Sequence, residues 1–177
     1  MTYSVNFANY TIGEDAYQNV REVCRHYGKK ALLIGGELAL KAGKEKLVQA
    51  LSDLSGTDSD SQAASTSAVT RGKKYAEDSE IEIVDTVLFG TDCMYVRMEE
   101  LAEHAKKCGA DMIFGMGGGK ALDTAKGTAE KAGLPVFTFP TIAATCAATT
   151  ALSVVYKEDG NFDSFYFYDK LVPHSVF

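Results

Sequence analysis

The sequence has no tryptophan, only three prolines and only three histidines among its 177 residues. No apolar run reaches about 18 residues, so we expect no transmembrane helix and no membrane partner. The N-terminal segment does not combine a basic region with an apolar one. We therefore expect no secretory signal peptide and a cytoplasmic protein.

Positive charge is also scarce, with 18 Lys and Arg against 24 Asp and Glu and a formal net charge of −6. A chain without a basic patch is not typical of nucleic-acid-binding proteins, so no nucleic-acid partner is expected. The cysteines show no CxxC spacing, and we expect free thiols rather than a disulfide framework. They are Cys24, Cys93, Cys108 and Cys146.

Short apolar segments alternate with helical patterns along most of the chain. Strands are expected at 31–34, 81–89, 111–114 and 134–139, and helices at 15–28, 37–54, 98–108 and 120–132. This alternation predicts an α/β fold with a Rossmann-like parallel sheet and flanking helices. The second helix is expected to bury mainly one face, which carries Leu38, Ala42, Leu47, Val48 and Leu51.

Two segments depart from the alternation. Residues 152–156 and 162–168 flank the turn signal Glu-Asp-Gly-Asn, which predicts a β-hairpin within 150–169. Residues 55–68 are rich in Ser, Thr and Asp and carry no large apolar side chain. We therefore expect a flexible insertion over 55–80, with a functional loop as the alternative to a solvated surface segment.

Four glycines in five positions separate the third expected strand from its helix, ending in Gly117, Gly118 and Gly119. Without Cβ atoms the backbone can approach a pyrophosphate, and the free N–H groups and dipole of the next helix attract its charge. Ligands of open α/β sheets bind at this end of the strands. Neither the GxGxxG nor the P-loop spacing is met, and a ligand-free glycine turn is the alternative.

Polar residues follow both this turn and the next strand. Asp123 lies one turn beyond Gly119, where a carboxylate suits the helix dipole, so a simple capping role is the alternative to ligand binding. Residues 139–150 are rich in small and hydroxyl side chains. Their threonines can supply hydroxyls to a ligand in the same cleft, although a packed loop fits equally well: Thr141, Thr145, Thr149 and Thr150.

The segments GMGGGKALDTAK (115–126), LPVFTFPTIAAT (134–145) and ALSVVY (151–156) together resemble the glycerol dehydrogenase branch of the iron-containing (group III) alcohol dehydrogenases. The resemblance is strongest over 110–168. It implies a dinucleotide-binding domain, here 1–177, and an NAD(P)-dependent oxidoreductase. Such an enzyme transfers hydride between the nicotinamide and a small alcohol or polyol, while a divalent metal (zinc or iron) in a separate helical domain polarises the oxygen.

The resemblance also implies which residues contact the dinucleotide. Its pyrophosphate would lie over the glycine turn, beside Lys120 and Asp123. The segment from Thr141 to 144, with Thr145 next to it, would lie near the adenine and ribose. The nicotinamide end would be closed by residues from the predicted hairpin and the segment before it, namely Thr150, Leu152 and Tyr156.

Two positions depart from the family pattern. The family often ends its first strand with an aspartate that binds the adenosine ribose, whereas here Gly36 stands there and Glu37 follows. We expect Glu37 to take that role and to favour NAD, with NADP as the alternative. Cys146 stands where many glycerol dehydrogenases have an aspartate that binds the polyol. We expect Cys146 to line the substrate pocket, which leaves the identity of the alcohol open.

The resemblance implies that the family's metal ligands are an aspartate just beyond the predicted hairpin and histidines far downstream in the helical domain. His26, His104 and His174 match none of them, so we assign neither a metal ligand nor a catalytic residue. We expect this chain to bind dinucleotide, to turn over little substrate by itself and to form a homo-oligomer. The alternatives are a dehydroquinate-synthase-like lyase that uses NAD and a dinucleotide-binding module without catalysis.

Overall fold

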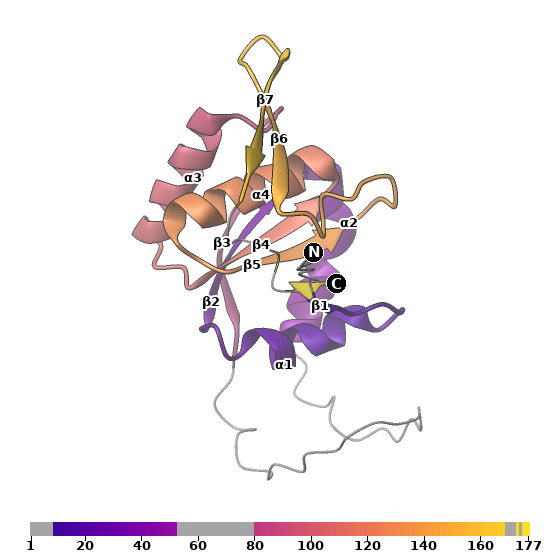
Figure 1. Cartoon of the computed structure of the whole chain (residues 1–177). Helices are drawn as coiled ribbons and strands as arrows, with labels where there is room; N and C mark the ends of the chain where they lie inside the picture. Colours follow the sequence, from indigo (N-terminus) through magenta and orange to yellow (C-terminus); the bar gives the residue numbers. More distant parts are fainter. Residues whose placement is uncertain (1–8, 53–79, 169–172, 174) are drawn as a thin grey trace, which may run out of the picture.

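The computed structural model describes residues 9–52, 80–168, 173 and 175–177 (Figure 1). The strands are β1 (Asn9–Tyr10), β2 (Lys30–Gly35), β3 (Glu82–Leu88), β4 (Met112–Gly117), β5 (Val136–Pro140), β6 (Leu152–Tyr156), β7 (Phe162–Phe167) and β8 (Ser175–Val176). The helices are the 3-10 helix η1 (Ala16–Asn19), α1 (Val20–Cys24), α2 (Glu37–Ser52), α3 (Tyr95–Lys107) and α4 (Gly119–Ala132).

Six strands form one parallel sheet in the order β1-β8-β5-β4-β2-β3, which confirms the predicted α/β class. Alternate residues of each strand enter different cores because successive side chains point to opposite faces. Leu33 packs in the core beneath α1 and α2, whereas Leu32 packs in the core beneath α3 and α4. Strand β4 is buried along its whole length, as a central strand covered on both faces should be.

The buried face of α2 agrees with the predicted one at Leu47 and Leu51 and differs from it at the other three positions. Leu38 is 82% exposed and Val48 is 44% exposed, and Ala42 is also exposed. Small residues face the sheet instead, since a Cβ added to Gly43 would lie 2.9 Å from Met116 Sδ. The sheet therefore selects a stripe with a spacing of four that contains Ala39, Gly43, Leu47 and Leu51.

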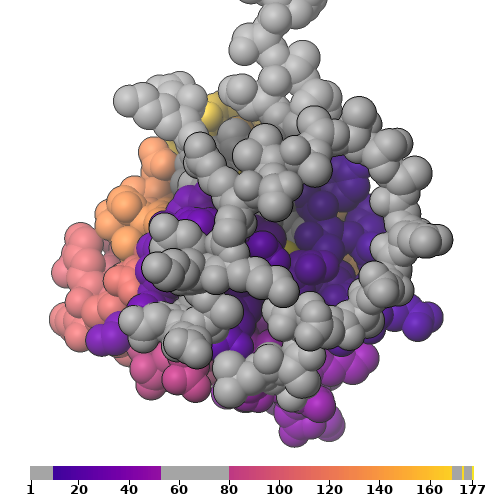
Figure 2. Space-filling model, turned by 90° about the horizontal axis from the view of Figure 1, so that it is seen from below, coloured from indigo at the N-terminus to yellow at the C-terminus, as the bar shows by residue number. Residues whose placement is uncertain are grey.

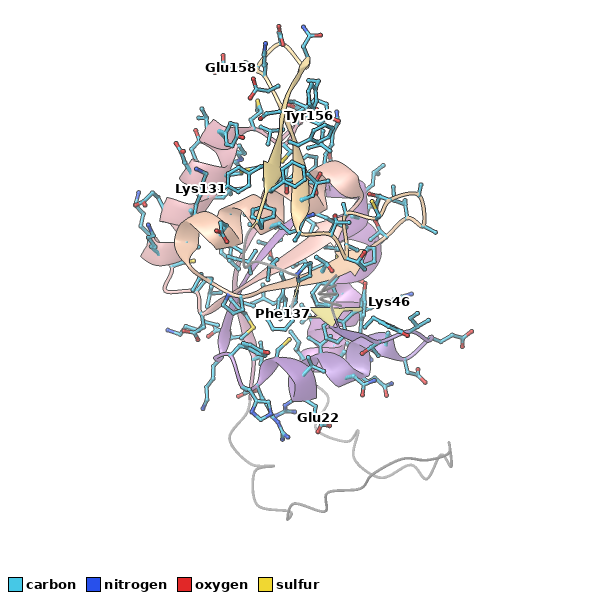
Figure 3. The ribbon with its side chains drawn as sticks, in the orientation of Figure 1. Glu22, Lys46, Lys131, Phe137, Tyr156 and Glu158 are labelled. Carbon is cyan, nitrogen blue, oxygen red and sulfur yellow. The ribbon has the colours of Figure 1, made fainter. Side chains whose placement is uncertain are left out.

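The predicted β-hairpin is confirmed. Strands β6 and β7 pair antiparallel, with Leu152 opposite Phe167 and Val154 opposite Phe165. In Figure 1 the hairpin stands above α4 and projects beyond the sheet, and Figure 3 shows Tyr156 on it and Glu158 near its tip. The insertion expected at 55–80 lies outside the described residues, apart from Glu80.

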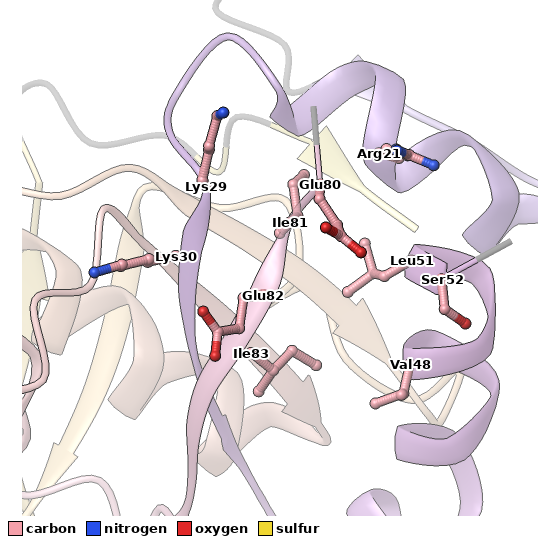
Figure 4. A pocket seen from close by; sticks show the side chains of 10 residues that line it. All are labelled: Arg21, Lys29, Lys30, Val48, Leu51, Ser52, Glu80, Ile81, Glu82 and Ile83. Atoms are coloured by element: carbon pink, nitrogen blue, oxygen red, sulfur yellow. The ribbon is translucent and has the colours of Figure 1, made fainter. Parts of the chain in front are cut away.

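At the opposite end of the molecule, the strands begin. Figure 2 views this end, where the described surface includes much of the first third of the chain, in indigo and purple. A hollow of about 860 Å³ lies where β2 and β3 start, and Val48 and Leu51 project into it from α2 toward Ile81 and Ile83 (Figure 4). Ser52 and Glu80 line it, and they adjoin residues 53–79, which the structure does not describe. We therefore infer no site there.

Two other expectations concern the whole chain. All four cysteines are free thiols, as predicted. Burial raises the pKa of the Cys93 thiol to about 12, so this thiol stays protonated at neutral pH. No helix within the described residues is long and apolar enough to cross a membrane.

Candidate functional site

A groove opens at the carboxyl ends of β2 and β4, which are neighbours in the sheet. Backbone hydrogen bonds join the strand ends, from Gly36 N to Met116 O at 3.2 Å and from Thr141 N to Gly117 O at 3.1 Å. A hollow of about 410 Å³ lies over this junction. It is lined by residues at the starts of α2 and α4, by the residue that follows β3 and by one threonine: Gly36, Glu37, Leu38, Ala39, Phe89, Gly117, Gly118, Gly119, Lys120, Ala121 and Thr141.

The glycines before α4 serve different purposes. A Cβ at Gly115 would lie 2.6 Å from Ala125 Cβ, so this glycine allows α4 to pack closely on β4. Gly117 has φ +150°, a conformation that other L-residues rarely adopt, and its Cβ would lie 2.8 Å from Ala121 Cβ. The strand therefore continues to Gly117, three residues beyond the predicted end, and the turn into α4 is tighter than predicted.

The start of α4 has the properties of an anion-binding helix terminus. Its N-cap is Gly118, and no side chain of the described part caps it. The first N–H groups of a helix have no partner within the helix, and they carry its partial positive charge. Because this terminus borders the hollow at the carboxyl edge of a parallel sheet, its N–H groups are placed to receive a phosphate.

The threonine-rich segment packs directly on the glycine turn. A Cβ at Gly118 would lie 2.9 Å from Ile142 Cδ1, and one at Gly119 would lie 3.1 Å from Thr145 Oγ1. Thr145 Oγ1 also accepts a hydrogen bond from Ala147 N at 3.1 Å. Thr138 Oγ1, from β5, donates to Ala148 O at 2.9 Å and holds the far part of the loop. Much of this segment is therefore packed, whereas Thr141 lines the hollow. The supply of threonine hydroxyls to a ligand stays a prediction.

Lys120 borders the hollow, but its ammonium group is already paired. It forms an ion pair with Asp92 and lies 4.8 Å from the centre of the Tyr156 ring. The hydrogen bond with Asp92 raises the pKa of Lys120, which stays charged at neutral pH. Lys120 thereby links the start of α4 to the hairpin, a position that brings Tyr156 close to the glycine turn.

Asp123 is not among the residues that line the hollow, and its expected contact with the dinucleotide stays a prediction. Its side chain is 5% exposed and faces the hairpin. Oδ2 accepts a hydrogen bond from Val154 N at 3.0 Å, while Oδ1 lies 2.8 Å from Lys126 Nζ. The carboxylate points this way because β6 packs on this side of α4. Its Oδ2 is therefore hydrogen-bonded to β6, and its Oδ1 forms the ion pair with Lys126.

The remaining predicted residues lie on the segment that leads into the hairpin. Thr150 and Leu152 are half-buried, and their carbonyl oxygens accept hydrogen bonds from Lys126. Cys146 is exposed, and its carbonyl accepts hydrogen bonds from Thr149 N and Oγ1. The substrate-pocket role of Cys146 stays a prediction, as do the cofactor contacts of the other residues.

Sequence reasoning did not single out Phe89 or Lys126. Phe89 is an apolar residue just after β3, and its place beside the hollow depends on how the sheet is assembled. Lys126 did carry a signal, because it lies three residues after an acid in a helix of otherwise mostly small residues. That spacing places the two charges on one helix face.

Comparison with known proteins places the chain in a family. Residues 57–177 match the family model "Iron-containing alcohol dehydrogenase". The chain belongs to the iron-containing alcohol dehydrogenase family. This confirms the resemblance drawn from the glycine turn, the threonine-rich segment and the hairpin.

Among the described residues, no group of three or more His, Cys, Asp or Glu could hold a metal ion.

Two relatives are similar in sequence to part of this chain. The glycolaldehyde reductase of Halobacterium salinarum is 41% identical over 85 residues, which are 48% of this chain and 23% of that protein. The glycerol dehydrogenase of Citrobacter freundii is 43% identical over 82 residues, which are 46% of this chain and 22% of that protein. The matched region thus spans less than a quarter of either relative.

Solved structures agree in fold over almost the whole chain. The NADH-dependent butanol dehydrogenase A of Thermotoga maritima superposes with a TM-score of 0.73 and 20% identity. The match covers 99% of this chain and 43% of that one. At this identity the comparison concerns the fold alone.

Proposed function

We propose that this chain is the dinucleotide-binding part of a metal-dependent alcohol or polyol dehydrogenase and that it binds NAD(H). The observation that carries the proposal is the uncapped start of α4, which borders a hollow at the carboxyl ends of the parallel strands. The names of the relatives, which include a glycerol dehydrogenase and a glycolaldehyde reductase, support a small hydroxyl- or carbonyl-bearing substrate.

The residues at the groove fit a dinucleotide. The N–H groups that begin α4 would hold the pyrophosphate, and the glycines leave its approach free of side chains. Glu37 begins α2 on the opposite side of the hollow and would accept hydrogen bonds from the adenosine ribose. Tyr156, Leu152 and Thr150 would border the nicotinamide, which supplies or accepts the hydride when the cofactor is bound.

The family also implies a divalent metal that polarises the alcohol oxygen. The donor chemistry needed is a convergent set of His, Cys, Asp or Glu, and the described residues present none. We therefore assign no metal ligand to the described part of this chain. We propose that this part of the chain binds and orients the cofactor. The homo-oligomer expected from the sequence stays a prediction.

A fluorescence titration with NADH and NADPH tests the proposal. Gly118→Val is the informative variant, because φ at Gly118 is −89° and a side chain there causes no backbone strain, although it would crowd the turn. We expect saturable NADH binding by the wild type and a loss of about tenfold or more in the variant. Ala132→Val, at the other end of α4, is the matched control and should bind as the wild type does.

The opposite result is equally clear. If the wild type binds neither nucleotide, or if Gly118→Val binds NADH as tightly as Ala132→Val does, the glycine turn is not a pyrophosphate site.

A further inference from the structure

Lys126 is a fully buried lysine at the contact between α4 and the hairpin. Its Nζ lies 2.8 Å from Asp123 Oδ1 and donates to Thr150 O at 3.0 Å and to Leu152 O. An ammonium group has three N–H donors. Its recorded acceptors are Thr150 O, Thr150 Oγ1 at 3.4 Å and Leu152 O, while Asp123 Oδ1 supplies the opposite charge of an ion pair without hydrogen-bond geometry. The charge is therefore satisfied although no water reaches it.

A buried charge is costly, so its presence needs an explanation. Burial lowers the pKa of Lys126, and the negative charge of Asp123 opposes this effect. Apolar side chains of similar size would fill the same space at lower cost. They would not, however, bind backbone carbonyls at two defined positions, Thr150 and Leu152. The pair therefore fixes the backbone rather than merely filling the interior.

Asp123 makes two further hydrogen bonds with β6. Its main-chain carbonyl accepts a hydrogen bond from Ser153 Oγ at 3.0 Å, and its carboxylate accepts one from Val154 N at 3.0 Å. Ser153 Oγ in turn lies 2.7 Å from Tyr168 OH, beyond the end of β7. Two residues of α4 thus hold the chain at 150, 152, 153 and 154, on both sides of the point where the hairpin begins.

Helix α4, which carries Asp123 and Lys126, packs closely on its neighbours. A Cβ at Gly127 would lie 2.3 Å from Met98 Sδ, so α4 touches α3 with no room between them. A Cβ at Gly115 would meet Ala125, so α4 is also pressed on β4. The glycine turn opens into this same helix, and Asp123 lies only one turn beyond it. The helix is therefore a rigid link between the turn and the hairpin.

We propose that Lys126, acting with Asp123, is a positioning residue that sets the nicotinamide end of the site by fixing the backbone of residues 150–154 on the helix that starts at the glycine turn. The inference rests on the proposed function, since it places Thr150, Leu152 and Tyr156 beside the nicotinamide. It goes further by assigning the buried ion pair a role in the geometry of one half of the cofactor site, with the pyrophosphate half unaffected.

A comparison of NADH with ADP-ribose, which lacks the nicotinamide, tests this division. The variants are Lys126→Met and the double variant Asp123→Asn with Lys126→Met, in which no lone carboxylate remains buried. In both we expect the Kd for NADH to rise about tenfold or more. The Kd for ADP-ribose should stay within about threefold of the wild type, because the glycine turn is intact.

Hydrogen exchange gives a readout that does not depend on ligand. The amides of residues 150–156 should exchange at least about tenfold faster in both variants, while those of β4 should be unchanged. Lys131→Met is the matched control, because Lys131 lies on the same helix and pairs with Glu99 at the surface. It should change neither the two Kd values nor the exchange of residues 150–156.

Several outcomes overturn the inference. If the variants weaken NADH and ADP-ribose equally and exchange rises throughout the sheet, the pair has only a general structural role. If they bind both ligands as the wild type does, the inference fails while the proposed function stands. If the wild type binds neither ligand, the proposed function fails, and this inference fails with it.

Discussion

Single atoms decide how closely α3 and α4 pack. A helix-interior Gly→Ala change usually stabilises by about 0.5–1 kcal/mol. At Gly127, however, the new methyl would lie 2.3 Å from Met98 Sδ and 2.6 Å from Cε. Because overpacking costs about 1–3 kcal/mol, we expect Gly127→Ala to lower the free energy of unfolding by about 1–2 kcal/mol. Urea denaturation measures the change.

The control for Gly127 is its neighbour. In a Met98→Ala background the thioether is gone, so Gly127→Ala should become neutral or stabilising. If Gly127→Ala already stabilises the protein that retains Met98, the two helices are not packed as closely as the structure indicates.

Glu37 carries a prediction about cofactor choice. Its carboxylate begins α2 beside the hollow, where it would repel the 2′-phosphate of NADPH. Repulsion of about 1 kcal/mol, the size expected for charges about 4 Å apart in water, corresponds to about fivefold in Kd. We expect Glu37→Gln to shift the ratio of the NADPH and NADH Kd values toward NADPH by this factor in fluorescence titrations.

Glu45 provides the matched control for Glu37, because it is an exposed residue of the same helix. Glu45→Gln makes the same change in net charge away from the hollow and should leave the ratio unaltered. Equal ratios in the two variants would contradict the ribose role of Glu37.

At the scale of elements, β3 and α3 are joined by a hydrogen bond between a histidine and a carboxylate. His104 Nε2 lies 2.7 Å from Asp85 Oδ2, and this hydrogen bond, followed by one from Thr86 N, lowers the pKa of Asp85. A lowered carboxyl pKa stabilises the fold above the unfolded value of about 4, and the gain is lost as pH falls through the folded value. Both side chains are more than a third exposed, so the gain should be about 0.5 kcal/mol or less.

We expect Asp85→Asn to be slightly less stable than the wild type at neutral pH and equally stable once the pH is well below about 4. Denaturant titrations at several pH values measure this difference, with Glu82→Gln on the same strand as a charge-matched control. A difference that persists or grows in acid would show that the Asp85 carboxylate does not contribute in this way.

At the scale of the whole molecule, the proposed site joins β2, β4, α2 and α4. A ligand bound there would contact the ends of all four elements at once. A ligand present at 100 times its Kd adds about 2.7 kcal/mol to the free energy of unfolding. We expect NADH at this concentration to stabilise the wild type by this amount in thermal and urea denaturation.

Gly118→Val should show no such stabilisation under the same conditions, whereas Ala132→Val should respond as the wild type does. If NADH stabilises Gly118→Val as well, the nucleotide binds at a place other than the glycine turn.

The sequence by itself determined the α/β class, the hairpin, the glycine turn and the family. These follow from local signals, because strand and helix periodicity, turn residues and a three-part motif can each be read without knowing what lies opposite. The end of α4 at Gly133 is one example, since its left-handed conformation, with φ +71°, is one that glycine favours.

Only the tertiary structure decided which surfaces meet. The face that α2 buries depends on the close approach of Met116 to Gly43, which residue size along the helix does not predict. Asp123 and Lys126 face the hairpin because β6 packs on their side of α4, and the ammonium group of Lys120 is engaged because Asp92 lies beside it. The physical reason is the same in each case. A charged or small side chain takes its role from the partner that the fold brings to it, and that partner is distant in sequence.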